Sequence, residues 1–226
     1  MSEPLQIIDL VKEYDELDAL RHVNLSFAAA QLVALVGHNG AGKSTLLGIV
    51  AGLIEPTEGE VLVAGHPAGT LPARAELTYA GDNPILYDDL SVWEHLEYVA
   101  GLHDVANWRD VGHQLLERFD LLERADDLPS RFSRGMRQKA ALAAALVRPA
   151  SVVIVDEPFV GLDIPAQQAL VDVLVGRARA GATVIVATHQ PAFLRHTDRC
   201  VLMHDGTVSR DEPPSDALIA ALQRQG

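Results

Sequence analysis

The sequence predicts an α/β fold with a mostly parallel sheet, a small N-terminal antiparallel β subdomain and a helical insert in the middle. After residue 130, short β-branched runs alternate with helical patterns, which is typical of a parallel sheet covered by helices on both faces. The early part of the chain instead carries apolar runs joined by hairpin-like turns. Residues 83–150 are mostly helical in pattern, so we expect them to form the insert.

Eight short apolar runs rich in β-branched residues are expected to be strands. They comprise residues 5–10, 24–28, 32–36, 60–63, 77–80, 152–155, 183–187 and 200–203. The clearest helical patterns between and after them lie at residues 92–102, 111–122, 134–147, 165–180 and 215–224. Three of these helices begin near the N-cap candidates Ser91, Ser133 and Ser215, and Pro165 lies in the first turn of another.

The composition describes a chain that can bury a large core. Its 226 residues are 48% apolar, but no run reaches the roughly 18 apolar residues of a membrane span. The N-terminus lacks the features of a secretory signal, so we expect a cytoplasmic protein. The 18 basic and 31 acidic residues give a net charge of −13, which argues against nucleic acid as the main ligand. The single cysteine, Cys200, lies in an apolar run and is expected to be buried.

The segment GHNGAGKST at residues 37–45 matches the phosphate-loop pattern G-x-x-x-x-G-K-[ST]. It follows the predicted strand at residues 32–36 and precedes a helical run at residues 44–51, which is the context that this motif requires. Successive backbone N–H groups of such a loop converge on an anion at a helix N-terminus. The segment therefore predicts a P-loop NTPase core that holds a nucleoside polyphosphate.

Glycines in this loop let the backbone turn around a phosphate. We expect Gly37, Gly40 and Gly42 to adopt positive φ angles, which glycine populates without steric cost. Lys43 supplies a mobile positive charge for the phosphates, and the hydroxyl of Ser44 is a candidate ligand for a metal ion.

A second chemical cluster, VVIVDEP at residues 152–158, ends an apolar strand with Asp156 and Glu157. Ligands of open α/β sheets gather at the carboxyl ends of the strands, so these carboxylates can meet the phosphate loop. Phosphoryl transfer uses one acid to help hold Mg²⁺ and another to orient or deprotonate the attacking water. We expect the chain to turn at the end of the strand, so that both side chains reach one site.

Three further segments make the pattern specific: FSRGMRQ at 132–138, GLD at 161–163 and ATHQ at 187–190. Together with the phosphate loop and the DEP segment, in this order, they resemble the ATP-binding cassette family over nearly the whole chain. The resemblance implies a single nucleotide-binding domain at residues 1–226 with its helical insert near residues 83–150. It also implies an ATPase that uses ATP and Mg²⁺.

The resemblance implies that the phosphate loop binds ATP and that Lys43 also takes part in catalysis. It implies that Ser44 and Asp156 hold Mg²⁺. Glu157 and His189 match the family's other catalytic positions, the second being a histidine that contacts the γ-phosphate. The loop residues implied in ATP binding are Gly37, Asn39, Gly40, Ala41, Gly42, Lys43, Ser44 and Thr45.

Other matched positions lie outside the loop and the strand ends. Tyr14 lies where the family keeps an aromatic side chain that stacks on adenine, although a tyrosine in an amphipathic strand is usually packing. Ser133 and Gly135 match the signature loop, which in a head-to-tail dimer covers the γ-phosphate held by the other subunit. An ordinary capped helix explains Ser133 equally well. Asp163 matches an acid that links the two sites across the dimer.

The sequence departs from the family pattern at a few positions. Asp82 aligns with the glutamine that usually contacts the metal and the attacking water. Asp82 could coordinate Mg²⁺ directly or through water, or it could be a turn former before Asn83 and Pro84. The signature carries Arg134 and Met136, and this S-x-G-M-[RK]-Q form resembles cassettes that serve exporter-type permeases.

The resemblance further implies ATP-driven closure of a dimer, made of two copies or of this chain and a related one. Closure would power a separate polytopic membrane permease. The chain itself would be cytoplasmic and peripheral to the inner face of the cell membrane. Residues 82–103 are candidates for this contact through Tyr87, Leu90 and Trp93, which serve equally well as the core of the insert. The helix at residues 215–224 is expected to pack against the domain rather than to bind a partner.

Two other classes of function stay open at this point. The first is a non-transport cassette ATPase that acts on a soluble or division-type complex. The second is a nucleotide-dependent binding or regulatory module with little turnover, against which Glu157 argues.

Overall fold

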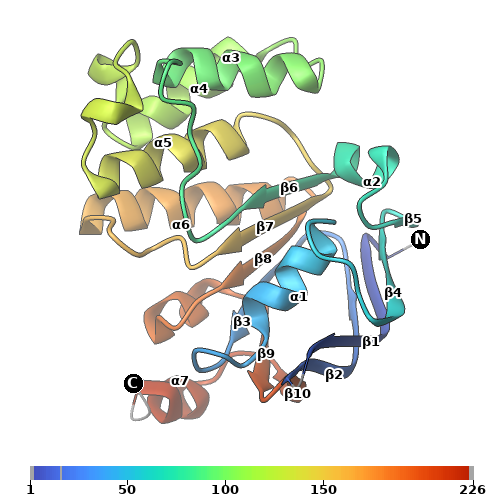
Figure 1. Ribbon diagram of the computed structural model, residues 1–226. Coiled ribbons are helices and arrows are strands. Elements are labelled where there is room, and N and C mark those ends of the chain that lie inside the picture. Colours follow the sequence, from blue (N-terminus) through green and yellow to red (C-terminus); the bar gives the residue numbers. More distant parts are fainter. Residues whose placement is uncertain (1–2, 16, 224–226) are drawn as a thin grey trace.

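The centre of the molecule is a six-stranded sheet with the strand order β10-β9-β3-β8-β7-β6 (Figure 1). The computed structural model describes residues 3–15 and 17–223. The strands of this sheet are β3 (Gln31–Val36), β6 (Leu77–Ala80), β7 (Val152–Asp156), β8 (Thr183–Ala187), β9 (Arg199–His204) and β10 (Thr207–Glu212). All pairings are parallel except that of β10 with β9. The predicted mostly parallel sheet is confirmed.

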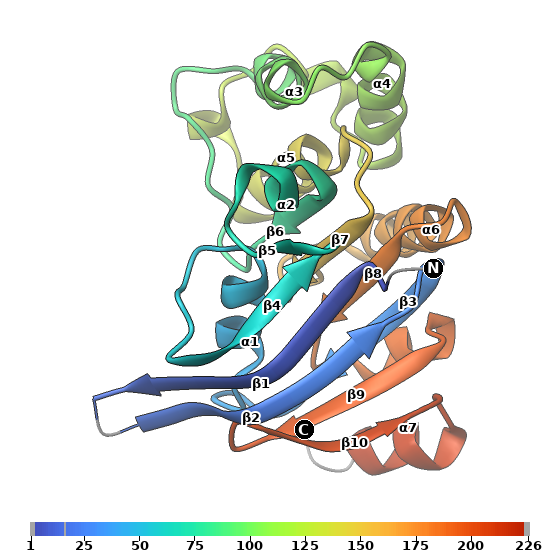
Figure 2. The same ribbon diagram turned by 90° about the vertical axis from the view of Figure 1, so that its right-hand side faces the viewer.

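A second sheet of four strands has the order β2-β1-β4-β5 and is antiparallel throughout. It consists of β1 (Leu5–Tyr14), β2 (Leu17–Phe27), β4 (Glu58–Val63) and β5 (His66–Pro67). Figure 2 shows the β1–β2 hairpin extending beyond the body of the molecule. Both strands are longer than predicted, because polar residues such as Lys12 and Glu13 continue the backbone ladder without an apolar run. The predicted N-terminal antiparallel β portion is confirmed.

Seven α-helices surround the two sheets in the described part of the chain. They are α1 (Lys43–Val50), α2 (Leu71–Glu76), α3 (Val92–Leu102), α4 (Trp108–Arg118), α5 (Arg134–Leu146), α6 (Ile164–Arg179) and α7 (Asp216–Gln223). The three predicted serine caps are confirmed, since the Ser91, Ser133 and Ser215 hydroxyls accept from backbone N–H groups three residues on. Residue 224, the predicted end of the last helix, lies outside the described residues.

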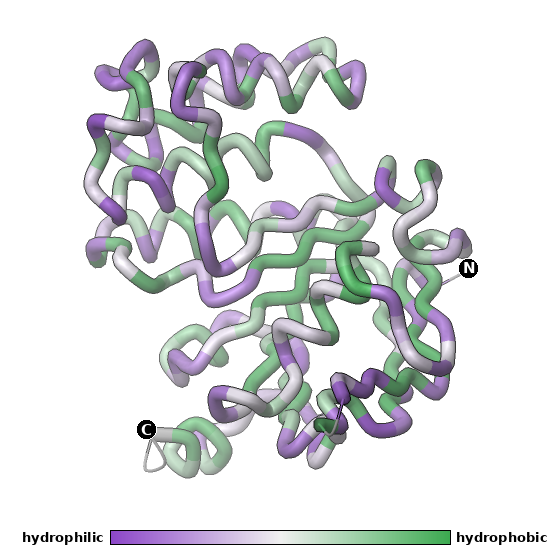
Figure 3. Tube along the Cα trace, in the orientation of Figure 1, coloured by the Kyte–Doolittle hydropathy of each residue, from purple (hydrophilic) through white to green (hydrophobic). Residues whose placement is uncertain are grey.

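Side chains of the central strands alternate between two cores. In β3, Leu32, Ala34 and Val36 pack in the cluster that contains α3 to α6. Val33 and Leu35 pack in the opposite cluster, with α1 and the antiparallel sheet. The central strands are therefore apolar on both faces, as the green tube of Figure 3 shows. The layers run antiparallel sheet, α1, central sheet, then α5 and α6.

Other elements also differ from the prediction, among them the unpredicted two-residue strand β5. β10 was not expected, because the sequence TVSRDE is polar and this edge strand is mostly exposed. α2 was not expected either, since only Ala73 of its six residues is buried. The helix expected at residues 111–122 begins at Trp108 and ends at Arg118, and Leu122 starts a short 3₁₀ helix instead. The expected burial of Cys200 is confirmed.

Candidate nucleotide-binding site

The carboxyl ends of five parallel strands meet at one edge of the central sheet, which is where ligands of open α/β sheets bind. β3 leads directly into the phosphate loop, and β7 ends at Asp156. Asp82, His189 and Asp205 follow shortly after the ends of β6, β8 and β9. Gly37 and Asp205, which are separated by about three quarters of the chain, are thereby brought to one edge.

The phosphate loop closes onto the N-terminus of α1. Gly40 and Gly42 have φ angles of 86° and 98°, so the prediction of positive φ is confirmed at these two positions. At Gly37 it is wrong. A Cβ atom at Gly37 would lie 2.5 Å from the backbone oxygen of Met203, so glycine is required there by the close approach of β9.

The side chain of Lys43 folds back onto the first residues of this loop. Its side chain is almost fully buried, and Nζ donates to the backbone oxygens of Gly37 at 2.7 Å and His38 at 3.2 Å. Two carbonyl acceptors fix this buried ammonium group against the start of the loop. The arrangement is suited to an anionic ligand.

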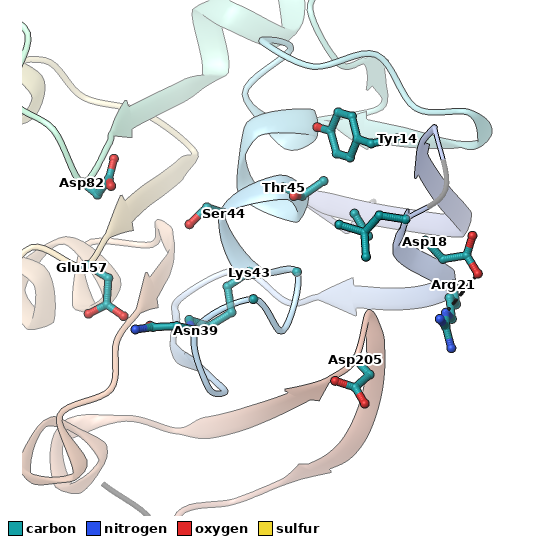
Figure 4. A pocket seen from close by; sticks show the side chains of 14 residues that line it. Tyr14, Asp18, Arg21, Asn39, Lys43, Ser44, Thr45, Asp82, Glu157 and Asp205 are labelled. Carbon is teal, nitrogen blue, oxygen red and sulfur yellow. Dashed lines mark ion pairs between the residues drawn. The ribbon is translucent and has the colours of Figure 1, made fainter.

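A cavity of about 480 Å³ opens beside the phosphate loop (Figure 4). Asp82 and Glu157 enter it from one side, and Tyr14 enters from the other. Six of the eight loop residues predicted to bind ATP line it, whereas Gly37 and Ala41 do not. The lining residues are Tyr14, Leu17, Asp18, Ala19, Arg21, Asn39, Gly40, Gly42, Lys43, Ser44, Thr45, Asp82, Glu157 and Asp205.

The sequence analysis missed the part of this lining that β2 and the β9–β10 turn supply. Leu17, Asp18, Ala19 and Arg21 carry no motif, and only their place after Tyr14 in the hairpin brings them to the cavity. Asp205 could have been found, because it follows a strand whose carboxyl end lies at the same edge.

Asp156 ends β7 and does not itself line the cavity, although its neighbours Ser44 and Asp82 do. It is 1% exposed, and its Oδ1 atom has no hydrogen-bond partner among the described residues. Burial raises the pKa of this carboxyl; Asp82 and Glu157 raise it further, whereas the Ser44 hydroxyl and Lys43 oppose the shift. An unpaired buried carboxylate oxygen beside a serine hydroxyl fits Mg²⁺, which prefers oxygen ligands.

The pKa of Tyr79, on the neighbouring strand β6, is affected by the same negative charges. Burial, followed by the carboxylates of Asp156 and Asp82, raises the pKa of Tyr79 to about 12. The site thus gathers acidic groups that a divalent cation would neutralise.

Glu157 turns the chain at the end of β7, as the sequence predicted. Its φ angle is 45°, a region that non-glycine residues rarely adopt, and its N–H donates to the backbone oxygen of Ala187 at 2.9 Å. The turn brings its Oε2 atom to 2.8 Å from Nδ1 of His189. These two side chains also line a second cavity of about 480 Å³ together with Gly37 and Arg134.

The signature residues lie apart from the phosphate-loop cavity. Ser133 caps α5, and a Cβ atom at Gly135 would lie 2.5 Å from the backbone oxygen of Gly161. Asp163 caps α6 through Ala166 and also accepts from Nζ of Lys139 at 2.9 Å. These two contacts lower the pKa of Asp163. None of Ser133, Gly135 and Asp163 lines the phosphate-loop cavity of the same chain.

The position of Asp82 is compatible with both roles considered for it, coordination of Mg²⁺ and formation of the turn before Asn83. It lines the cavity, and its Oδ1 atom accepts from the side-chain amide of Asn83 at 3.0 Å in the turn after β6. Among the candidate contact residues, Tyr87 is exposed, whereas Leu90 is half-buried. Trp93 is also half-buried and packs on Trp108, with ring centroids 5.1 Å apart, so it belongs to the core of the insert.

Comparisons with known proteins agree with this geometry. The family model described as "ABC transporter" matches residues 20–160. The SkfA peptide export ATP-binding protein SkfE of Bacillus subtilis is 36% identical over 212 residues, which cover 92% of this chain and 88% of that protein. The aliphatic sulfonates import ATP-binding protein SsuB 2 of Pseudomonas fluorescens is 35% identical, covering 92% of this chain and 76% of that protein.

Solved structures show the same fold. A dimeric ATP-binding cassette in a post-hydrolysis state with ADP and Pi superposes with a TM-score of 0.84. It is 26% identical to this chain, and the match covers 92% of this chain and 98% of that structure.

Proposed function

The chain belongs to the ABC transporter family as an ATP-hydrolysing, nucleotide-binding subunit, and from that premise we propose that it powers a separate membrane permease of the exporter type. The observation that carries the ATPase part is the meeting of the phosphate loop with Asp156, Glu157 and His189 at one sheet edge. The relatives include proteins named for export and for import, so they do not decide the direction of transport. The proposed export direction therefore rests on the S-x-G-M-R-Q signature.

In the proposed reaction, the loop amides and Lys43 bind the phosphates of ATP, while Tyr14 stacks on the base. Ser44 and Asp156 would hold Mg²⁺, with Asp82 at the cavity wall as a third candidate. When bound, this ion neutralises charge on the β and γ oxygens. Glu157 accepts the proton of the attacking water.

His189 holds Glu157 through the 2.8 Å contact of Nδ1 with Oε2. Nδ1 donates to the carboxylate, so Nε2 can donate to the γ-phosphate only when the imidazole carries a proton on both nitrogens. The roles of both residues follow from their place at the end of neighbouring strands β7 and β8.

Completion of the site is proposed to require a second nucleotide-binding subunit, either another copy or a related chain. Ser133 and Gly135 lie at the start of α5 and outside the cavity of their own chain. In a head-to-tail pair, this helix N-terminus would instead face the γ-phosphate on the opposite phosphate loop. Contacts made to both subunits favour the closed dimer, and loss of the γ-phosphate removes them.

The proposed permease contact lies on the segment between β6 and α3. Ile85 and Tyr87 are 92% and 55% exposed and lie at a groove of about 580 Å³. Tyr98 of α3 meets Tyr87 edge to face, with centroids 5.7 Å apart. An apolar surface next to a groove is suited to a partner's helix or loop. No helix in the described residues is long and apolar enough to cross a bilayer.

We further propose that residues 1–226 form one nucleotide-binding domain, with the insert near residues 83–150 carrying α3 to α5. Its proposed place is the inner face of the cell membrane. This location follows from the proposed permease alone, because a net charge of −13 gives the chain no attraction of its own to anionic lipid.

The test is co-purification from native membranes followed by reconstitution. We expect a polytopic membrane protein to accompany the wild-type chain, and substrate movement in proteoliposomes to require ATP. The Glu157→Gln variant should retain the partner and lose movement. Recovery of soluble partners alone would favour the non-transport cassette ATPase.

The direction of transport is a separate readout. ATP added outside inside-out vesicles should drive substrate into the lumen if the complex is an exporter. Movement out of preloaded vesicles under the same conditions would contradict the exporter assignment without affecting the ATPase assignment.

A further inference from the structure

Three polar side chains without a role in the proposed reaction gather where the β9–β10 turn meets the phosphate loop. Nε2 of His38 lies 3.4 Å from Oδ1 of Asp205, and Nδ1 of His204 lies 3.3 Å from Oδ2 of the same carboxylate. The two imidazole rings meet edge to face with centroids 5.0 Å apart. One potential ligand atom from each residue lies within 4.8 Å of the other two.

The backbone on both sides of this cluster is fixed. The N–H of Gly206 donates to the backbone oxygen of Ala41 at 3.1 Å, and its C=O accepts from Arg21 at 2.9 Å. Asp205 and Gly206 have φ angles of 45° and 76°, as in a two-residue hairpin turn of the primed type. The turn is therefore held against the phosphate loop, and His38 is held on the loop itself.

The hydrogen bonds of His38 direct one nitrogen at the carboxylate. Nδ1 lies 2.8 Å from the backbone oxygen of Asn39, which can only accept, so Nδ1 carries a proton. In the neutral ring, Nε2 then presents its lone pair to Asp205. Two acceptors 3.4 Å apart repel one another unless a cation or a second ring proton lies between them.

We propose that His38, His204 and Asp205 form a binding site for a transition-metal ion of the Zn²⁺ type. Imidazole and carboxylate are ligands that suit Zn²⁺, and the bond from His38 Nδ1 to a carbonyl is the usual partner of a metal-bound histidine. The remaining coordination position is open to water, because all three residues are exposed.

The side chains need only a small rearrangement to close around an ion. Metal–ligand bonds of about 2.0–2.2 Å bring ligand atoms to within roughly 4 Å of one another. In the structure, the candidate ligand atoms of the three residues lie within 4.8 Å of one another. Rotation of exposed side chains covers this difference, since the side chains of His38, His204 and Asp205 are 49%, 65% and 66% exposed.

The site is distinct from that proposed for Mg²⁺, which is built from oxygen ligands at Ser44 and Asp156. It nevertheless shares structure with the nucleotide site, because His38 belongs to the phosphate loop and Asp205 lines the nucleotide cavity. If the proposed nucleotide binding is correct, occupancy of one site changes the affinity of the other by the same factor in both directions.

The test is calorimetric titration of the untagged, nucleotide-free full chain with Zn²⁺, because ATP itself chelates this ion. We expect one ion per chain. His204→Ala should weaken binding at least about tenfold, as should Asp205→Asn. The matched control is His113→Ala, which removes an exposed histidine of α4 and should leave the affinity unchanged.

Co²⁺ provides a second readout. The wild-type chain should give the visible absorption of Co²⁺ with nitrogen ligands, and His204→Ala should lose it while keeping the wild-type melting temperature. Absence of saturable Zn²⁺ binding would overturn the proposal, as would a His204→Ala variant that binds Zn²⁺ as tightly as the wild type. The cluster would then be explained by an ion pair between His38 and Asp205. Neither outcome depends on nucleotide binding.

Discussion

The imidazole of His189 lies against the carboxylate of Glu157, with Nδ1 2.8 Å from Oε2. The two residues are 32 positions apart in sequence and follow the adjacent parallel strands β7 and β8. Glu157 reaches this position through a backbone conformation with φ 45°, which costs energy for a residue with a side chain. Local strain at the end of a buried strand is typical of functional sites.

Glu157→Gln should bind ATP and accumulate as a closed dimer, with hydrolysis reduced at least about a hundredfold, because an amide cannot accept the proton of water. Phosphate release and the elution volume with MgATP measure the two effects. Glu117→Gln, an exposed residue of α4, is the matched control and should behave as wild type. Unchanged turnover in Glu157→Gln would falsify the assignment of the general base.

Lys43→Ala should lose ATP affinity itself, because the buried ammonium group and the loop amides are proposed to bind the same phosphates. Equilibrium titration with a fluorescent ATP analogue measures this loss. Arg179→Ala removes an exposed positive charge at the end of α6 and should leave affinity unchanged. The melting temperature shows whether loss of the Nζ bonds to Gly37 and His38 has unfolded the loop. Normal affinity in a folded Lys43→Ala chain would contradict the phosphate cradle.

Asp156→Asn should stabilise the nucleotide-free chain at neutral pH while abolishing Mg²⁺-dependent hydrolysis. The pKa of Asp156 is raised in the fold above its ordinary value of 3.8, mainly by burial. The ionised carboxyl therefore destabilises the fold increasingly as pH rises from that value through the raised pKa. A gain of about 1 kcal/mol would raise the melting temperature by about 2–4 °C.

The same variant gives a pH signature. The difference in melting temperature between Asp156→Asn and wild type should narrow as pH falls, because wild-type Asp156 then becomes neutral. A difference that is constant from pH 8 downward to about 4 would mean that burial of this charge has no cost.

Tyr14→Ala should weaken binding of ATP by about 1–3 kcal/mol, the usual worth of stacking between a base and an aromatic side chain. Tyr14→Phe should retain the affinity, since the proposed contact uses the ring rather than the hydroxyl. Titration with ATP and with inorganic tripolyphosphate separates base from phosphate contacts. If Tyr14→Ala lowered affinity for both ligands equally, the aromatic role would be wrong.

Gly135→Ala should destabilise the chain by about 1–3 kcal/mol, because the new methyl group meets the backbone oxygen of Gly161 at 2.5 Å. Gly176→Ala is the matched control on α6. A Cβ atom there meets nothing within 4 Å, so alanine should stabilise the helix by about 0.5–1 kcal/mol. Chemical denaturation measures both changes, and equal effects would show that the contact with Gly161 is readily relieved.

Local patterns identified the elements that carry the chemistry. The apolar runs at residues 152–155 and 183–187 are strands because they are buried on both faces, and buried β-branched runs have a strong sequence pattern. The edge strand β10 has no such pattern, because exposed polar residues are held in it only by pairing with β9. Motif spacing likewise predicted Lys43, Asp156 and Glu157 together, whereas Arg21 on β2 could not be predicted to line the cavity.

By itself, the sequence determined the α/β class, the phosphate loop, the order of the segments proposed to be catalytic and the identity of the acids at the strand ends. Only the tertiary structure decided why Gly37 must be glycine, how deeply Asp156 is buried and that His38 meets His204 and Asp205. The physical reason is the range of the forces involved. Backbone propensity and periodicity act within a segment, whereas steric contact, desolvation and charge proximity depend on segments that only the folded chain brings together.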